Sequence, residues 1–539
     1  MAEVAFPPVS FDTHPSRYVH WELQVDGPVA TMVMRVQEDR PLWPGYELKL
    51  NSYDLSVDVE LADAVQRLRF EHPEVRCVVV TGGYDRIFCA GANIRMLASA
   101  SHAFKVNFCK FTNETRCAIE DAAAHSGQTW IAALNGTASG GGYELAEACE
   151  EIYLIDDGNS AVSLPEVPLL GVLPGTGGLT RLTDKRKVRR DIADVFCTKA
   201  EGFKARDAVK YRLVDGSFSR SRWAEAIRAR ALAIAAAAAP RDAAPVQLPA
   251  LERTLRDDGL EYRYVSVKLD KEARIADLVI RGPEESPGRD ANTWALRAWR
   301  ELDDALLRLR FNELDCGLIQ LRTVGDPAAV LAHDAALDDG TWFSGEVLGF
   351  QARVLRRLDN MAKSLFAIIE PGNCFAGSLA EMLFAVDRSY MLADEDGENT
   401  ITLSARSGGV YPMSSGQSRL AARFPATPAQ VTKALAHRGA IDAEAADRLE
   451  LVTAAPDAID WDDEVRIAVE ERASLSPDAL TGMEQNLRFG GAESCDTKIY
   501  GRLTAWQNWI FQRPNAVGER GALKMFGAPE RAIFDYRRT

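Results

Sequence analysis

The chain has 539 residues, more than a single hydrophobic core usually serves, so we expect two or three domains. Its formal net charge of −15 argues against a nucleic-acid or anionic-membrane partner. The nine cysteines are scattered without a C-x-x-C pair, which predicts neither disulfides nor a bound metal and favours the cytoplasm. Neither a secretory signal nor an apolar run of membrane-spanning length is present, so we also expect no membrane partner.

The predicted elements begin with strands over residues 21–25 and 29–35, joined by an Asp-Gly turn, and a helix over residues 54–70. Further along the chain we predict a strand at 77–80, a helix at 118–124, a strand at 130–134, a helix that contains Glu144, a strand at 151–155 and a helix at 223–239. Strands that alternate with helices favour a mostly parallel sheet with crossover connections, an α/β fold.

The second half of the chain repeats the first weakly, at a separation of roughly 240 residues. The paired positions in that register are Gly140 and Gly377, Gly141 and Ser378, Glu144 and Glu381, and Glu166 and Ser404. The second copy has therefore lost half of any acid–base pair, and we interpret it as a scaffold repeat. We predict a catalytic unit over residues 1–250, a degenerate unit over 251–456 and a helical C-terminal extension over 457–539.

Three short runs in the first unit can build one acyl-transfer site. They are Phe-Cys-Ala-Gly-Ala at residues 88–92, Gly-Gly-Gly-Tyr-Glu at 140–144 and Leu-Pro-Glu at 164–166. The first two are small-residue turns that follow predicted strands, and such turns expose backbone N–H groups. Two amides from different loops that point at one carbonyl oxygen form an oxyanion hole.

Two acidic residues in these runs can supply proton transfer. A glutamate in isolation is most often a solvated surface residue, but Glu144 starts a helix at a glycine turn and Glu166 follows a predicted strand. Both can then point into one cleft, where two carboxyl groups push each other's pKa values apart. Two such carboxyl groups are suited to the addition or activation of water. Which of the two is the acid and which the base stays open.

The three runs resemble the core motifs of the crotonase (enoyl-CoA hydratase/isomerase) superfamily, over about residues 21–237. The resemblance implies a crotonase-like ββα-superhelix (ClpP/crotonase fold), present here as two tandem units. It also implies that the amides of Ala92 and Gly141 bind a thioester oxygen and that Glu144 and Glu166 are the catalytic pair. The positions that it assigns to coenzyme A binding are Lys49, Arg95, Ala90 and Gly140.

Two parts of that resemblance leave alternatives open. Lys49 and Arg95 can equally be solvated surface cations, because many side chains can contact a phosphate. Asn93 stands where the superfamily usually has Asp, a change that leaves the backbone of the oxyanion hole untouched. The run Gly-Thr-Gly-Gly at 175–178 is similar to part of a phosphate loop but lacks the lysine, so we predict that it opens a helix.

The full length, with residues 106–116 and 511–527, resembles a ring-opening branch of the superfamily. This resemblance implies conversion of 2,3-epoxybenzoyl-CoA and two waters to 3,4-dehydroadipyl-CoA semialdehyde and formate, with no cofactor beyond the coenzyme A of the substrate. The alternatives are a hydratase or isomerase for another acyl-CoA and a non-catalytic acyl-CoA-binding protein. Cys109 either lines the ring pocket or is an inert buried thiol. We expect a homodimer.

Overall fold

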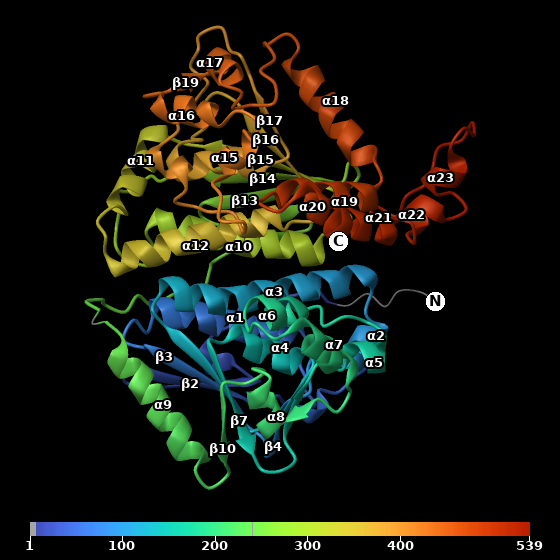
Figure 1. The fold of residues 1–539 in the computed structure, drawn as a ribbon. Coiled ribbons are helices and arrows are strands. Elements are labelled where there is room, and N and C mark those ends of the chain that lie inside the picture. Colours follow the sequence, from blue (N-terminus) through green and yellow to red (C-terminus); the bar gives the residue numbers. More distant parts are fainter. Residues whose placement is uncertain (1–6, 240) are drawn as a thin grey trace. The chain divides into compact units, whose positions relative to one another are not determined.

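The computed structural model describes residues 7–239 and 241–539, which form two compact units. The first unit runs over Phe11–Leu248, and the second contains Pro249–Thr539 together with the short segment Pro8–Ser10. In Figure 1 the first unit is coloured blue to green and the second yellow-green to red. Residues 457–539, which we predicted as a separate extension, lie within the second compact unit.

The first unit is built on a six-stranded sheet. Its strands, in spatial order, are β1 (Trp21–Asp26), β2 (Val29–Met34), β3 (Cys77–Gly82), β5 (Thr129–Leu134), β7 (Glu151–Asp156) and β10 (Gly216–Ser219). The first two form an antiparallel hairpin, and Gly27 in its turn has a φ of +56°. All other neighbours are parallel. The predicted hairpin and the predicted parallel sheet are thus confirmed.

Nine helices of the first unit connect and cover these strands in the described residues. They are α1 (Leu55–Phe70), α2 (Ile94–Ser99), α3 (His102–His125), α4 (Gly141–Ala148), α5 (Glu166–Leu170), α6 (Gly178–Asp184), α7 (Arg190–Thr198), α8 (Ala205–Lys210) and α9 (Trp223–Ala237). The helix predicted at 118–124 was too short, because it is only the last part of α3. The buried side of α3 carries polar residues such as Thr112 and Arg116, so its apolar residues do not recur at helical spacing along the whole helix.

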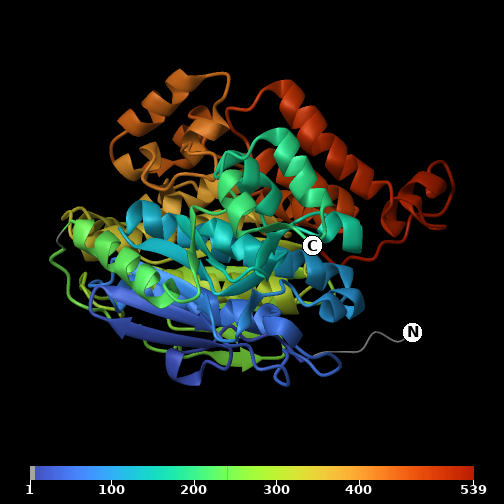
Figure 2. The same cartoon turned by 60° about the horizontal axis from the view of Figure 1, so that its bottom comes forward.

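Helix α9 covers one face of the main sheet. Its Ile227 and Ala231 join Cys77, Val79 and Ile131 in a buried apolar cluster. Figure 2 shows this bright green helix along the blue and cyan strands. Burial of one apolar helix face against a sheet face is the usual way in which an α/β layer is stabilised.

A second, smaller sheet in the first unit positions the predicted site. It contains β4 (Arg86–Cys89), β6 (Gly136–Ser139), β8 (Ala161–Ser163) and β9 (Phe203–Lys204), in that order. Strands β4, β6 and β8 are parallel to one another. The carboxyl end of each of these strands leads into one of the motif runs, at 88–92, 140–144 and 164–166. Because the strands are parallel, the three runs leave the sheet at the same edge.

The second unit repeats the plan of the first. Its strands are β11 (Thr254–Arg256), β12 (Gly259–Glu261), β13 (Val265–Asp270), β14 (Ile275–Arg281), β15 (Leu318–Val324), β16 (Ser364–Ile369) and β17 (Arg388–Met391), again in spatial order. The strands from β14 onward are parallel, whereas those before it are antiparallel. The predicted repeat of the first unit in the second half of the chain is confirmed.

The helices of the second unit also follow that plan. They include α10 (Trp294–Asn312), α11 (Pro327–Ala336), α12 (Trp342–Asp359), α13 (Gly377–Ala380), α14 (Met382–Ala385), α18 (Trp461–Ser474), α19 (Pro477–Arg488) and α21 (Thr504–Ile510). Helix α18 packs against the sheet through Trp461, Val465 and Val469, which contact Phe366 and Tyr390. It covers the second sheet much as α9 covers the first. Among the described residues, no helix is both long and apolar enough to cross a membrane.

Candidate active site

Two backbone amides of the first unit, on neighbouring loops, have no hydrogen-bond acceptor among the described residues. Tyr53 pairs with the loop after β4, because its N–H donates to Gly91 C=O at 3.0 Å and its C=O accepts from Asn93 N–H at 2.8 Å. These bonds use the amide and carbonyl on either side of Ala92, so the N–H of Ala92 points away from Tyr53. Among the described residues neither this N–H nor that of Gly141 has a hydrogen-bond acceptor.

The two loops that carry these amides touch each other. Gly91 has a φ of +89°, and a Cβ atom placed on it would lie 2.8 Å from Gly141 N. Gly140 has a φ of +54°, and a Cβ there would lie 2.7 Å from Glu166 Oε1. The glycines thus permit both the turns and the close approach. Two unpaired N–H groups from touching loops can form an oxyanion hole.

Glu144 is held beside this pair of amides as a hydrogen-bond acceptor. It lies on α4, one turn after Gly141, and only 3% of it is exposed. Its Oε1 accepts from the N–H groups of Thr176 and Gly178, at 2.9 and 2.8 Å, and its Oε2 accepts from the Thr176 hydroxyl. The run at 175–178 that supplies these donors opens α6, as predicted.

Glu166 differs from Glu144 in its surroundings. It is the first residue of α5, it is buried, and its Oε2 has no hydrogen-bond partner among the described residues. Burial, followed by the negative charge of Glu144, raises the pKa of Glu166 to about 7. A carboxyl group with this pKa can both give and take a proton near neutral pH.

The residues predicted to hold coenzyme A lie next to the amides, and their role stays a prediction. Lys49 and Arg95 are exposed on the segments that flank Tyr53 and Ala92. Lys49 Nζ lies 2.7 Å from Glu47 Oε2, and the charges of Lys49 and Arg95 both lower the pKa of Glu47. The structure therefore brings the two cations to one surface, which also carries an acidic neighbour.

Ala90, Gly140 and Asn93 contribute to the shape of these loops. The amide of Ala90 donates to Leu50 C=O at 3.2 Å, and that of Gly140 donates to Ser163 C=O at 2.9 Å. The side chain of Asn93 accepts from Met96 N–H and donates to Glu47 C=O at 2.7 Å. An aspartate could not make that last bond, because a carboxylate only accepts.

Cys109 lies on α3 and is half-buried. Burial raises the pKa of its thiol to about 11, and the charges of Glu144 and Asp58 act in the same direction. The thiol therefore stays protonated at neutral pH and is no ready nucleophile. Its electrostatic coupling to Glu144 is compatible with a position that lines the site, and its catalytic role stays a prediction.

Sequence reasoning missed several residues around the carboxyl pair. Glu147 lies one turn after Glu144 and is fully buried, with no hydrogen-bond partner for either oxygen in the described chain. Burial and the charge of Glu144 raise the pKa of Glu147 well above its usual value, which favours its protonated form. Its i, i+3 spacing from Glu144 was a usable signal. Tyr53 and Thr176 carried no such signal, because loop partners are set by the tertiary fold.

In the second unit the backbone amide that corresponds to that of Gly141 already has a hydrogen-bond acceptor. Gly377 has a φ of +49°, close to that of Gly140, and the next amide, Ser378 N–H, donates to Asp334 Oδ2 at 2.6 Å. A Cβ on Gly377 would overlap this carboxylate. Ser404, at the position of Glu166, accepts from Arg406 N–H at the start of a short helix. The second unit thus lacks both an open amide and the second acid.

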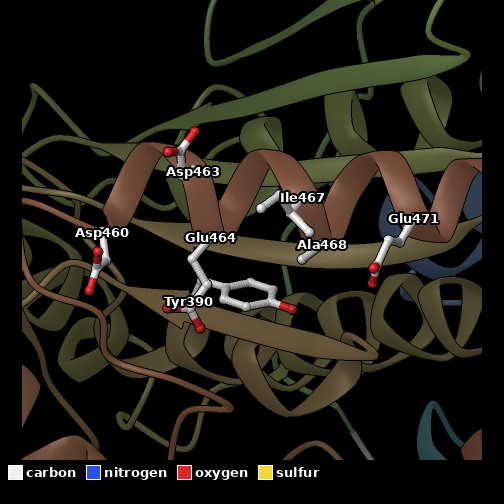
Figure 3. Close-up of a pocket in the computed structure, with 7 residues that line it drawn as sticks. All are labelled: Tyr390, Asp460, Asp463, Glu464, Ile467, Ala468 and Glu471. Atoms are coloured by element: carbon white, nitrogen blue, oxygen red, sulfur yellow. The ribbon is translucent and has the colours of Figure 1, made fainter.

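A separate pocket of about 420 Å³ lies in the second unit, between α18 and β17 (Figure 3). It is lined by Tyr390, Asp460, Asp463, Glu464, Ile467, Ala468 and Glu471. Its carboxylates come from α18 and its N-cap residue Asp460, and none of the three motif runs contributes to it. Over residues 7–239 and 241–539, no group of three or more side chains could hold a metal ion.

Comparison with known proteins connects this geometry to a family. A family model described as enoyl-CoA hydratase/isomerase matches residues 47–282. Over 98% of its length the chain is 54% identical to the benzoyl-CoA-dihydrodiol lyase of Aromatoleum evansii, of which it covers 98%. It is 28% identical to the carnitinyl-CoA dehydratase of Proteus mirabilis strain HI4320, over 42% of this chain and 77% of that protein. A solved enoyl-CoA hydratase from Bacillus anthracis is 26% identical and covers 40% of this chain and 77% of its own, with a TM-score of 0.34.

The raised pKa of Glu166 predicts a pH-dependent stability difference. The unfolded chain has the ordinary pKa near 4.5 and the folded chain about 7, so the wild type loses stability as the pH rises through this window. Glu166→Gln cannot ionise and escapes that loss. We expect its stability relative to the wild type to increase by about 3 kcal/mol between pH 4.5 and 8. Thermal melting of the variant and the wild type at both pH values measures this, and Glu201→Gln, at an exposed position, is the control. A stability difference between Glu166→Gln and the wild type that is the same at pH 4.5 and at pH 8 would contradict the prediction.

The hydrogen bond from Ser378 N–H to Asp334 in the second unit predicts that a small carboxylate can restore the stability of a variant that lacks Asp334. Asp334→Ala leaves Ser378 N–H unpaired, which we expect to cost about 1 to 3 kcal/mol of stability. Acetate or formate can replace the missing carboxylate and should raise the melting temperature of this variant more than that of the wild type. Asp326→Ala, which removes the cap of the same helix, is the control and should show no such rescue. Equal responses of the two variants would show that the site takes no anion.

Proposed function

Because the chain belongs to the enoyl-CoA hydratase/isomerase family and is similar along its length to a benzoyl-CoA-dihydrodiol lyase, we propose that it is a ring-opening carbon–carbon lyase. Its substrate is 2,3-epoxybenzoyl-CoA, which takes up two waters and yields 3,4-dehydroadipyl-CoA semialdehyde and formate. The observation that carries this proposal is the pair of unpaired amides, Ala92 and Gly141, with two buried carboxyl groups beside them.

The oxyanion hole serves the step that releases formate. Hydration of the epoxide and cleavage of the C2–C3 bond leave a formyl group on the carbon next to the thioester. Water adds to that formyl group, and expulsion of formate leaves a carbanion that is a thioester enolate. Its charge rests on the oxygen that the Ala92 and Gly141 amides bind, where loss of one donor typically costs about 3 kcal/mol.

Proton transfer is divided between the two carboxyl groups. Glu144, held by three donors from the Thr176 loop, orients and activates water as an acceptor. Glu166, whose pKa lies at about 7, gives and takes protons at the ring and at the enolate carbon. The reaction is hydrolytic and two waters balance it, so it needs no redox cofactor. Lys49 and Arg95 bind the phosphates of the coenzyme A moiety.

A hydratase or isomerase for another acyl-CoA is the second candidate, because it would use the same amides and the same acids. The similarity to the lyase over both units favours ring opening, since the similarity to the carnitinyl-CoA dehydratase of Proteus mirabilis covers less than half of the chain. We place the enzyme in the cytoplasm, where its nine free cysteines would stay reduced.

Analysis of products tests the function. We expect wild-type enzyme with 2,3-epoxybenzoyl-CoA to release formate, detected by mass spectrometry together with the semialdehyde thioester. Glu144→Gln and Glu166→Gln should each lower turnover by orders of magnitude and leave binding of benzoyl-CoA largely unchanged, because each removes a proton-transfer group. Exposed Glu201→Gln should behave as the wild type. Simple hydration or double-bond migration without formate would instead support the second candidate.

A homodimer is the assembly that we propose. Within the first unit, exposed apolar side chains cluster at 167–173, where Leu169 and Leu173 are 66% and 65% exposed. The C-terminal helices of the second unit expose Leu503, Phe511 and Phe526. Apolar patches of this kind usually mark contact surfaces. We expect light scattering to give twice the chain mass, and Phe511→Glu or Leu173→Glu to shift it toward the monomer. A monomeric wild type would contradict this proposal.

A further inference from the structure

A buried tyrosine hydroxyl lies against the oxyanion hole, and the roles assigned so far leave it unused. Tyr53 is only 1% exposed. Its hydroxyl oxygen has no hydrogen-bond partner among the residues that the structure describes. A Cβ placed on Gly141 would overlap this oxygen, so the hydroxyl lies directly against the residue whose amide forms half of the hole.

The position of Tyr53 follows from the same contact that sets the hole. Its backbone pairs with Gly91 and Asn93, which turns the amide of Ala92 away from it, while its side chain reaches the other donor residue, Gly141. Tyr53 therefore bridges the two loops, by its backbone to one and by its ring to the other. Its hydroxyl also interacts electrostatically with Glu144.

The ring is held firmly by α3. The Arg116 guanidinium carbon lies 5.3 Å from the centre of the Tyr53 ring, and the ring centre of Phe108 lies 6.1 Å away. Arg116 is fixed in turn by Asp58, at 2.7 Å, and both side chains are buried. A ring packed between a paired guanidinium and a second aromatic ring has little freedom to move its hydroxyl.

This hydroxyl keeps its proton at neutral pH, so it can act as a donor. Burial raises the pKa of Tyr53 well above its usual value, and the opposing charge of Arg116 does not reverse that. A buried O–H group without an acceptor is costly, and native proteins rarely keep one unless a ligand or another function satisfies it. The nearest chemistry that requires a further donor is the thioester oxygen bound by Ala92 and Gly141.

We propose that the Tyr53 hydroxyl is a third hydrogen-bond donor to the thioester oxygen of the bound acyl-CoA. The inference rests on the proposed function, since it assigns a further catalytic residue to the same site. No covalent bond forms and no proton is transferred; the O–H group strengthens its hydrogen bond as negative charge accumulates on the oxygen. A third donor suits the enolate left by loss of formate, because this intermediate carries a full charge on that oxygen.

Tyr53→Phe removes only the hydroxyl and tests the proposal in two ways. Turnover on 2,3-epoxybenzoyl-CoA should fall by about 10- to 100-fold with KM little changed, because the lost bond acts mainly on the charged state. The infrared carbonyl band of bound benzoyl-CoA, labelled with ¹³C at the thioester, should shift less from its value in water than in the wild type. The melting temperature should stay equal or rise, because an unsatisfied buried group is gone.

Tyr143→Phe is the matched control. Tyr143 is also fully buried and lies on α4, but its hydroxyl donates to Leu213 C=O at 2.6 Å. Its loss should lower the melting temperature and leave the carbonyl band unchanged. The proposal is wrong if Tyr53→Phe keeps the wild-type carbonyl band, or if it loses stability as Tyr143→Phe does while turnover is unchanged. If Tyr53→Phe does not fold, Tyr53→Leu carries the same infrared measurement.

The infrared measurement also separates this inference from the proposed function. It uses benzoyl-CoA, which has no epoxide, and therefore does not depend on ring opening. A wild type that releases no formate but polarises the carbonyl through Tyr53 would overturn the lyase proposal and leave the third donor in place. A wild type that releases formate with a carbonyl band independent of Tyr53 would overturn only the third donor.

Discussion

The parallel arrangement of three very short strands is the constraint on which the site depends. Because β4, β6 and β8 run in one direction, the runs that follow them emerge at the same edge. The ladder has few bonds, so single contacts such as Gly140 N–H to Ser163 C=O determine its register. A slip of one residue would reverse which groups face the cleft, and the amide of Gly141 would no longer meet the loop of Ala92.

Once the loops converge, unequal hydrogen bonding separates the roles of neighbouring carboxyl groups. Glu144 receives three donors from the Thr176 loop, whereas both carboxyl oxygens of Glu147 and the Oε2 of Glu166 are buried without a hydrogen-bond partner among the described residues. Burial penalises a charge wherever donors do not compensate it, and the charge of Glu144 adds to that penalty for both neighbours. One acceptor, one group that titrates near neutral pH and one carboxyl group whose protonated form is favoured thus arise from three chemically identical side chains.

Much of the fold could be predicted from the sequence because local patterns carry it, whereas the catalytic role of the pair of acids stays a prediction. Apolar runs predicted β3 and β5, but the runs at 88–92 and 140–144 follow the short strands β4 and β6, which were not predicted. The full length of α3 was missed, since Thr112 and Arg116 face inward and pair with Asp58, a contact between residues far apart in the sequence. Tyr53 was missed for the same reason, because nothing in its own segment indicates that its ring reaches Gly141.

The two units show that an inherited backbone does not preserve an inherited site. Gly377 keeps the left-handed conformation of Gly140, so the chain turns alike in both units. In the first unit the following amide is free, but in the second it is bound by Asp334, a carboxylate from α11 in the same unit. Burial outweighs the amide of Ser378 and the charge of Arg406 and raises the pKa of Asp334 to about 6, which still leaves the ionised form favoured at pH 7. A thioester oxygen would have to displace that anion, and Ser404 offers no second acid in compensation. Divergence of a few side chains is therefore enough to turn one copy of this fold into a scaffold, while its sheet and helices remain recognisable.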